Sequence, residues 1–171
     1  MDNFAKLDAA ERTPFFEEIA SRRSSTTTAI EKDFWVSWTL KHLFALKHVP
    51  ELRFKGGTSL SKVFRLVDRF SEDIDISIDR AALGFTGERD LAHPHLSTTK
   101  RKALDVELRE AITKEVTSDL LPKLRASFEP YSQKAKVDAR TVRRSQRGND
   151  TRFLLPSCVR LQGLPTSSDQ T

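Results

Sequence analysis

Three aspartates, Asp73, Asp75 and Asp79, stand two or four positions apart in the segment "RFSEDIDISID" at 69–79. Residues i and i+2 of a strand project to the same side, with Cα atoms about 6.5–7 Å apart, so Asp73 and Asp75 can bind one cation or straddle two. Crowded carboxylates repel each other, and a divalent cation removes that cost. The spacing predicts a magnesium site at Asp73 and Asp75, because Mg²⁺ binds through one or two carboxylates plus substrate phosphates. The alternative is a solvated strand face.

A pair of glycines precedes these acids. Gly56 and Gly57 follow the short strand candidate at 52–54 and Lys55, and Thr58 and Ser59 come next. Backbone N–H groups, hydroxyls and the positive end of a helix all suit a phosphate group, and glycine lets the backbone approach it closely. The segment therefore predicts a phosphate cradle, although it would also serve as an ordinary turn from strand to helix. A cradle joined to a metal pair suits nucleotidyl transfer, in which metals stabilise the attacking and leaving oxygens.

A strand, a turn, a helix and a second strand must position these residues. The segment "LRF" at 52–54 is typical of a short strand, and the apolar spacing of 58–69 predicts an amphipathic helix. Strict alternation in "EDIDISID", residues 72–79, predicts a strand with the isoleucines on one face and the acids on the other.

The flanking chain is predicted to be mostly helical. Thr13 before Pro14 indicates a helix over 14–23, and Thr28 with Glu31 has the spacing of a capping box for a helix over 29–46. Apolar residues that recur every four positions from residue 98 onward predict a long helix with a break or kink near Pro122. The remaining predicted elements are a long loop at 80–97 and two strands, at 135–142 and 151–161.

Positive charge is concentrated in one segment. Residues 132–152 contain seven cations and two acids, a balance of +5 that equals the net charge of the whole chain. Such a cluster favours a polyanion such as RNA, and the alternative is a solvated basic hairpin that keeps the protein soluble. The candidate RNA-binding residues are Lys134, Lys136, Arg140, Arg143, Arg144 and Arg147.

Composition sets the protein class. A chain of 171 residues, 37% hydrophobic and 31% charged, is typical of one globular domain. No apolar run is long enough to cross a membrane and the N-terminus does not resemble a signal peptide, so we expect a cytoplasmic protein. Its single cysteine, Cys158, has no partner for a disulfide. We expect an N-terminal helix and connector at 1–27, the main domain at 28–161 and an irregular tail at 162–171.

Two quoted segments carry a family resemblance. "FKGGTSLSK" at 54–62 followed by "RFSEDIDI" at 69–76 resembles the AbiEii/AbiGii toxin family, within the DNA polymerase β-type nucleotidyltransferase superfamily. "IEKDFWVSWTLKHLF" at 30–44 is similar to the N-terminal helix of that family. The resemblance covers roughly residues 28–80 well and weakens beyond them.

The resemblance implies a fold, an activity and partners. The fold is α/β (α+β), a small mixed sheet flanked by helices. The enzyme transfers a nucleoside monophosphate from a nucleoside triphosphate (NTP) to an acceptor hydroxyl with Mg²⁺ as cofactor. Family members are toxins of toxin–antitoxin or phage-defence systems, and some modify tRNA, so the resemblance implies an RNA or tRNA acceptor and an antitoxin partner. Asp73 and Asp75 would be the catalytic metal ligands. Phosphates would be bound by Gly56, Gly57, Thr58, Ser59 and Lys62, with Lys55 on the other flank.

One part of the superfamily pattern is missing. A third carboxylate is expected from a later strand, and the segment that best resembles that strand, "SCVRLQG", has Gln162 where an acid is expected. Asp138 is a candidate substitute, or simply a surface acid among basic residues. The chain also ends without the helical C-terminal region of the family, which predicts a truncated relative. The alternative function is therefore a catalytically incompetent module that binds a nucleotide, RNA or a protein partner.

Overall fold

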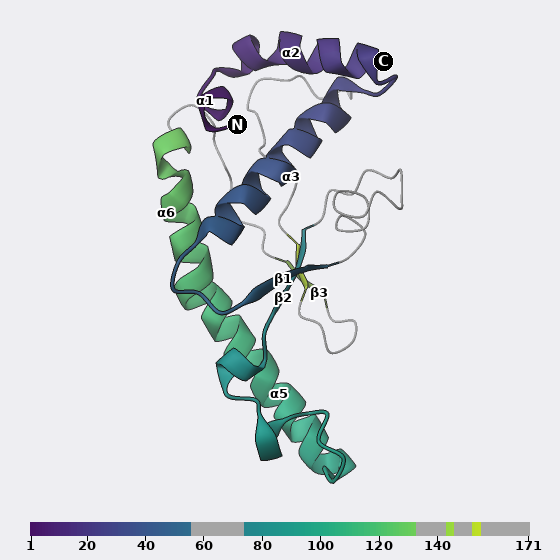
Figure 1. Ribbon diagram of the computed structural model, residues 1–171, viewed down its shortest axis with the longest axis vertical. Helices are drawn as coiled ribbons and strands as arrows, with labels where there is room; N and C mark the ends of the chain where they lie inside the picture. The colour runs from purple at the N-terminus through teal and green to yellow at the C-terminus, as the bar shows by residue number, and fades with distance from the viewer. Residues whose placement is uncertain (56–73, 133–142, 146–151, 155–171) are drawn as a thin grey trace, which may run out of the picture.

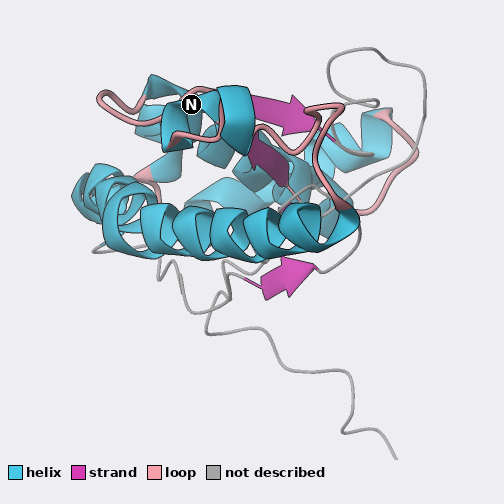
Figure 2. Ribbon diagram, turned by 90° about the horizontal axis from the view of Figure 1, so that it is seen from below, coloured by secondary structure: helices cyan, strands magenta, loops and turns pink. Residues whose placement is uncertain are grey.

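The computed structural model describes residues 1–55, 74–132, 143–145 and 152–154 (Figure 1). Figure 2 shows that helices make up most of this part of the chain, with short strands among them. This arrangement confirms the predicted α/β (α+β) class with a small sheet and flanking helices. The helices are α1 (Asp2–Ala5), α2 (Ala9–Arg22), α3 (Thr27–Ala45), α5 (Thr98–Glu115) and α6 (Leu121–Ser132).

Two predicted helix starts were wrong by a few residues. Helix α2 begins at Ala9 rather than after Thr13, because Asp8 and Glu11 form a capping box in which the Asp8 backbone N–H donates to the Glu11 carboxylate at 2.7 Å. The reciprocal cap satisfies two backbone N–H groups at the start of the helix, which the predicted Thr13–Pro14 start would not do. Because the helix begins at Ala9, Pro14 lies inside it. Helix α3 is capped by Thr26, whose hydroxyl accepts from the Ala29 N–H at 3.2 Å, two positions before the predicted cap.

Helices α5 and α6 form one continuous rod along the long axis of the molecule (Figure 1). Between them lies a π-helical turn, η3 (Val116–Leu120), which ends two residues before Pro122. Proline lacks an N–H, and its ring clashes with the carbonyl four residues earlier, so a wider turn at this point accommodates it without ending the helix. The irregularity near Pro122 is therefore a π-helical turn, and the predicted break in the helix is wrong.

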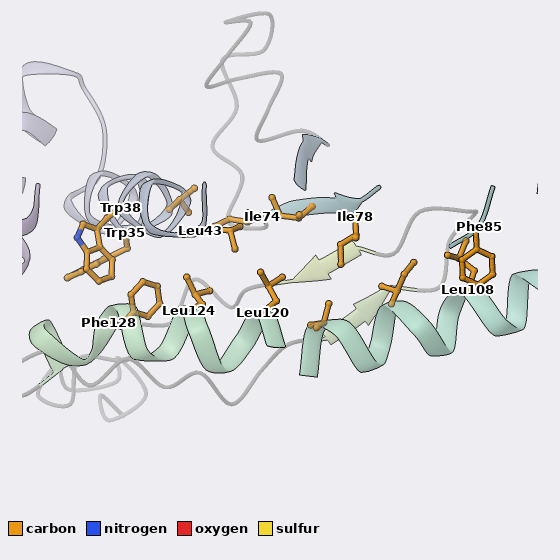
Figure 3. Close-up of a cluster of buried hydrophobic side chains, with 14 of the residues drawn as sticks. Trp35, Trp38, Leu43, Ile74, Ile78, Phe85, Leu108, Leu120, Leu124 and Phe128 are labelled. Atoms are coloured by element: carbon orange, nitrogen blue, oxygen red, sulfur yellow. The ribbon is translucent and has the colours of Figure 1, made fainter. Parts of the chain in front are cut away.

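The rod presents one apolar stripe to the rest of the molecule. Every fourth residue from Leu104 to Leu124 is buried, with at most 5% of its surface exposed, as the spacing predicted. Figure 3 shows side chains of this stripe facing α3 and the strands, with Trp38 close to Phe128. The rings of Trp38 and Phe128 are stacked with centroids 4.7 Å apart. The stripe therefore joins α3, the strands and the rod into one core.

Four short strands are present in the described residues. β1 (Leu52–Lys55) pairs antiparallel with β2 (Asp75–Ile78), and β3 (Arg143–Ser145) pairs antiparallel with β4 (Arg152–Leu154). β4 also lies beside β2. The predicted strand at 52–54 is confirmed and extends to Lys55, and β2 lies within the predicted strand at 72–79. β4 lies within the strand predicted at 151–161, whereas 58–69 and 135–142 lie outside the described residues.

The predicted loop at 80–97 is packed against the rod. It contains two 3₁₀ turns, η1 (Ala81–Leu83) and η2 (Gly87–Arg89), and it buries Phe85 and Leu91 in the core. Arg89 donates to Glu107 of α5 at 3.0 Å. The approach to β1 is also held to the rod, because the Lys123 ammonium donates to the His48 carbonyl at 2.6 Å. The start of β1 and the end of β2 lie at the same end of the antiparallel ladder, and that end is thus fixed from outside the sheet.

The buried stripe should dominate stability. Leu108 is 2% exposed in the core, so Leu108→Ala should lower the free energy of unfolding by about 2–5 kcal/mol through lost burial and a residual cavity. Val106 lies on the same helix with 54% of its surface exposed, and Val106→Ala should change that free energy by no more than about 0.5 kcal/mol. Urea unfolding followed by circular dichroism measures both, and similar losses for the two variants would contradict the assigned core.

Acid should weaken the junction of α1, α3 and α6. Burial lowers the pKa of His42 against the opposing effect of Asp2, and the ring packs between Trp38 and Tyr131. The unfolded chain therefore takes up this proton first, so the stability that the neutral ring provides is lost as pH falls through about 6.5. The pKa of Asp2 is itself lowered, by Lys41, so Asp2 titrates below this window.

Unfolding free energies measured at pH 7.5 and 5.5 test this prediction. The wild-type protein should lose more stability between the two pH values than His42→Phe, which cannot take up a proton. Equal losses in the two proteins would show that His42 does not contribute.

Candidate active site

The register of the β1–β2 ladder brings together the two halves of the predicted site. Lys55, the last residue of β1, is the direct partner of Asp75, the first residue of β2. In the sequence, Gly56 follows Lys55 and Asp73 lies two residues before Asp75. The chain therefore leaves β1 toward the glycines at the same end of the ladder where it enters β2 from the aspartates.

The isoleucine face of β2 is built as predicted. Ile74, Ile76 and Ile78 are 2%, 3% and 6% exposed, and they belong to the core. In the ladder Phe54 is the partner of Ile76 and Leu52 of Ile78, so apolar residues pair with apolar residues. This packing fixes the register, because a slip of one residue would turn the isoleucines away from the core.

The acids on the other side of β2 are not equivalent. Asp75 is buried, with 9% of its surface exposed, whereas Asp79 is half-buried and continues the pairing through its backbone N–H to the Glu51 carbonyl at 3.0 Å. A charged carboxylate is rarely buried unless it is paired or bound to a metal, because removing the ion from water costs on the order of several kcal/mol. Asp75 therefore does not belong to a solvated strand face, which was the alternative interpretation.

Asp75 has the properties of a metal ligand. It offers hard carboxylate oxygens, which Mg²⁺ prefers, from a strand whose backbone is fixed on both sides. Within the described part of the chain no group of three His, Cys, Asp or Glu residues could hold a metal by itself. The donor chemistry of Asp75 fits a divalent cation bound with a second ligand, and Asp73, the predicted second ligand, lies outside the described residues.

Some of the other predicted site residues lie within the described part of the chain and others lie outside it. The whole phosphate cradle lies outside the described residues: Gly56, Gly57, Thr58, Ser59 and Lys62. So do Asp138 and Gln162, which bear on the third carboxylate. Among the basic candidates, Arg143 and Arg144 lie in β3, whose partner β4 is beside β2. Lys134, Lys136, Arg140 and Arg147 lie outside the described residues. The structure thus brings part of the basic segment to the strand that carries Asp75.

The close relation between Lys55 and Asp75 was not predicted from the sequence, which assigned Lys55 only to a flank of the cradle. The signal was present in the alternation of "LRFK", where Leu52 and Phe54 face the core and Lys55 falls on the opposite side. Pairing those apolar residues with Ile78 and Ile76 places Lys55 opposite Asp75. Without a turn of known length between the strands, the sequence did not determine the register.

Comparison with models of known protein families shows to which family the chain belongs. The family model described as the nucleotidyl transferase AbiEii toxin of type IV toxin–antitoxin systems matches residues 38–163. The chain belongs to this AbiEii family. No curated protein and no solved structure matches the chain significantly. The AbiEii match includes both strands of the ladder, the glycine pair and the aspartates, so it confirms the resemblance seen in the segments at 54–62 and 69–76. Of the segment at 30–44 it covers the part from Trp38 onward.

Membership in the AbiEii family assigns a general role, that of a nucleotidyltransferase toxin of a toxin–antitoxin system. The predicted boundaries at 1–27, 28–161 and 162–171 stay predictions. In the described residues, no helix combines the length and the apolar character that crossing a bilayer requires.

Proposed function

We propose that this chain transfers a nucleoside monophosphate from an NTP to a hydroxyl of an RNA acceptor, most simply tRNA, in a Mg²⁺-dependent reaction. The observation that supports this proposal is the pairing of Lys55 with buried Asp75. Because of this pairing, the glycine segment after Lys55 and the Asp-x-Asp segment around Asp75 meet the ladder at the same end. A site for a metal-bound triphosphate requires its phosphate-binding and metal-binding groups to be close together in this way.

In the proposed site each part of the chain has one task. Asp73 and Asp75 hold the metal, which when bound neutralises charge on the phosphates and on the developing transition state. Gly56 and Gly57 bring the backbone close to the triphosphate, Thr58 and Ser59 donate hydrogen bonds to it, and Lys62 adds a positive charge.

The reaction is an in-line displacement at the α-phosphorus. The acceptor hydroxyl oxygen forms the new P–O bond, the bond from the α-phosphorus to its bridging oxygen breaks, and pyrophosphate leaves with that electron pair. The hydroxyl proton goes to a base, for which Asp138 or solvent are the candidates in this chain. The core beneath β2 contributes rigidity, because the buried isoleucines keep the backbone of Asp75 in place when a cation binds.

The proposed acceptor is RNA because basic residues lie near the acidic strand. β3 carries Arg143 and Arg144, and its partner β4 lies beside β2. Cations at this place can hold a phosphate backbone near the site without reading its sequence. An antitoxin that opposes this activity is the implied partner, and a role in phage defence is part of the same proposal.

A second candidate function is a binding module without catalysis. It is favoured by Gln162, which stands where the superfamily has an acid. Such a protein would still bind Mg²⁺ and an NTP through the cradle and Asp75, and would act by holding the nucleotide, RNA or a protein partner.

Label transfer from each of the four radiolabelled NTPs to bulk tRNA tests the enzyme. Asp75→Asn should lower transfer by at least about a hundredfold, because a bound metal supplies several kcal/mol of charge stabilisation. Ser77→Ala, two residues along the same strand, is the matched control and should retain transfer. Equal transfer by both variants would contradict the assigned role of Asp75. No transfer by the wild-type chain, with Mg²⁺-dependent nucleotide binding intact, would establish the binding module instead.

The salt dependence of tRNA binding tests the acceptor surface. Arg143→Gln/Arg144→Gln should reduce the slope of log affinity against log salt by roughly 1.4–1.8, since each lost phosphate contact removes 0.7–0.9. Lys100→Gln/Lys102→Gln, an equal change of charge at the exposed start of α5, should leave the slope unchanged. Equal effects of the two pairs would mean that net charge alone attracts the RNA.

A further inference from the structure

Lys55 is placed to cover the buried carboxylate of Asp75. Directly opposed residues of an antiparallel pair have Cβ atoms about 4.5–5.5 Å apart and project to the same side. Lys55 is exposed, whereas Asp75 is 9% exposed. The flexible lysine stem therefore allows its ammonium group to approach the carboxylate from the solvent side. Neither residue is without an interaction partner in the structure.

This arrangement distinguishes Lys55 from the other cation on β1. Arg53 lies on the same side of the strand, but its ladder partner is Ser77, and its guanidinium pairs with Glu51 of the same chain segment at 3.1 Å. The Arg53–Glu51 pair is exposed, with 60% and 64% of the two side chains accessible. Within the described β1–β2 ladder, Lys55 is thus the cation directly opposite an acid.

A metal and the lysine ammonium compete for the same carboxylate. A buried carboxylate needs a positive partner, and Lys55 is placed to supply one when no metal is bound. A divalent cation bound to Asp75 would replace that partner and would repel the ammonium group. Lys55 immediately precedes Gly56 and Gly57, where the proposed function places the triphosphate.

We propose that Lys55 is a positioning residue that acts as a built-in counter-ion of Asp75, is displaced by the divalent metal, and then binds a phosphate of the incoming NTP. This inference rests on the proposed function. It makes metal and nucleotide bind together, because a bare metal must displace the lysine whereas a metal-bound triphosphate gives the lysine a new partner. The coupling is reciprocal, so the nucleotide tightens metal binding by the same factor as the metal tightens nucleotide binding.

Mn²⁺ binding measured by electron paramagnetic resonance tests the counter-ion without depending on turnover. Lys55→Met should bind Mn²⁺ alone at least about fivefold more tightly than the wild type, and it should bind ATP in the presence of Mn²⁺ at least about fivefold more weakly. Lys55→Arg keeps the charge and should behave as the wild type for Mn²⁺ alone. Arg53→Met is the matched control and should change neither affinity by more than about twofold.

The variants separate failure of this inference from failure of the proposed function. If Asp75→Asn abolishes Mn²⁺ binding while Lys55→Met leaves it unchanged or weaker, the metal site stands and the counter-ion role of Lys55 is wrong. If Asp75→Asn retains wild-type Mn²⁺ affinity, or the wild type binds no Mn²⁺, the proposed metal site fails and the inference fails with it. Circular dichroism of each variant confirms that the fold is retained.

Discussion

The register between β1 and β2 is the constraint on which the site depends. Two short strands with few hydrogen bonds would pair weakly by themselves. Their register is fixed because Ile74, Ile76 and Ile78 must all reach the core, and only one alternation of β2 allows this. The same alternation turns Asp75 away from the core, and in the observed register Asp75 lies opposite Lys55. Apolar packing on one side of the strand thus positions charge on the other.

The helices provide the surface against which this register is set. The apolar stripe of the α5–α6 rod and the tryptophans of α3 form a core that is continuous with the isoleucines (Figure 3). The π-helical turn before Pro122 lets the rod continue without a break, and Lys123, the next residue, holds the approach to β1. A carboxylate fixed in this way meets the requirement of pre-organisation that the proposed metal site would have.

Local sequence patterns predicted most of the elements, and long-range packing decided the rest. The four-residue spacing from Leu104 to Leu124 determined the long helix, and alternation in "IDISI" determined β2, because periodicity is a property of the chain itself. The start of α2 was missed because Asp8 and Glu11 cap each other, a signal that competes with Thr13–Pro14. The Lys55–Asp75 pairing could not be predicted, since a register between strands nineteen residues apart depends on what packs against them. The burial of Asp75 has the same origin.

The most direct test is paramagnetic broadening of backbone amide signals by Mn²⁺ in solution. If the ladder brings the two halves of the site together at one metal, substoichiometric Mn²⁺ should broaden the signals of Lys55 and Asp75 together. Signals of α2, which packs on α3 away from the strands, should stay sharp (Figure 1). Broadening of Asp75 without Lys55, or of neither, would show that the metal does not bind where the two strands meet and would contradict the account.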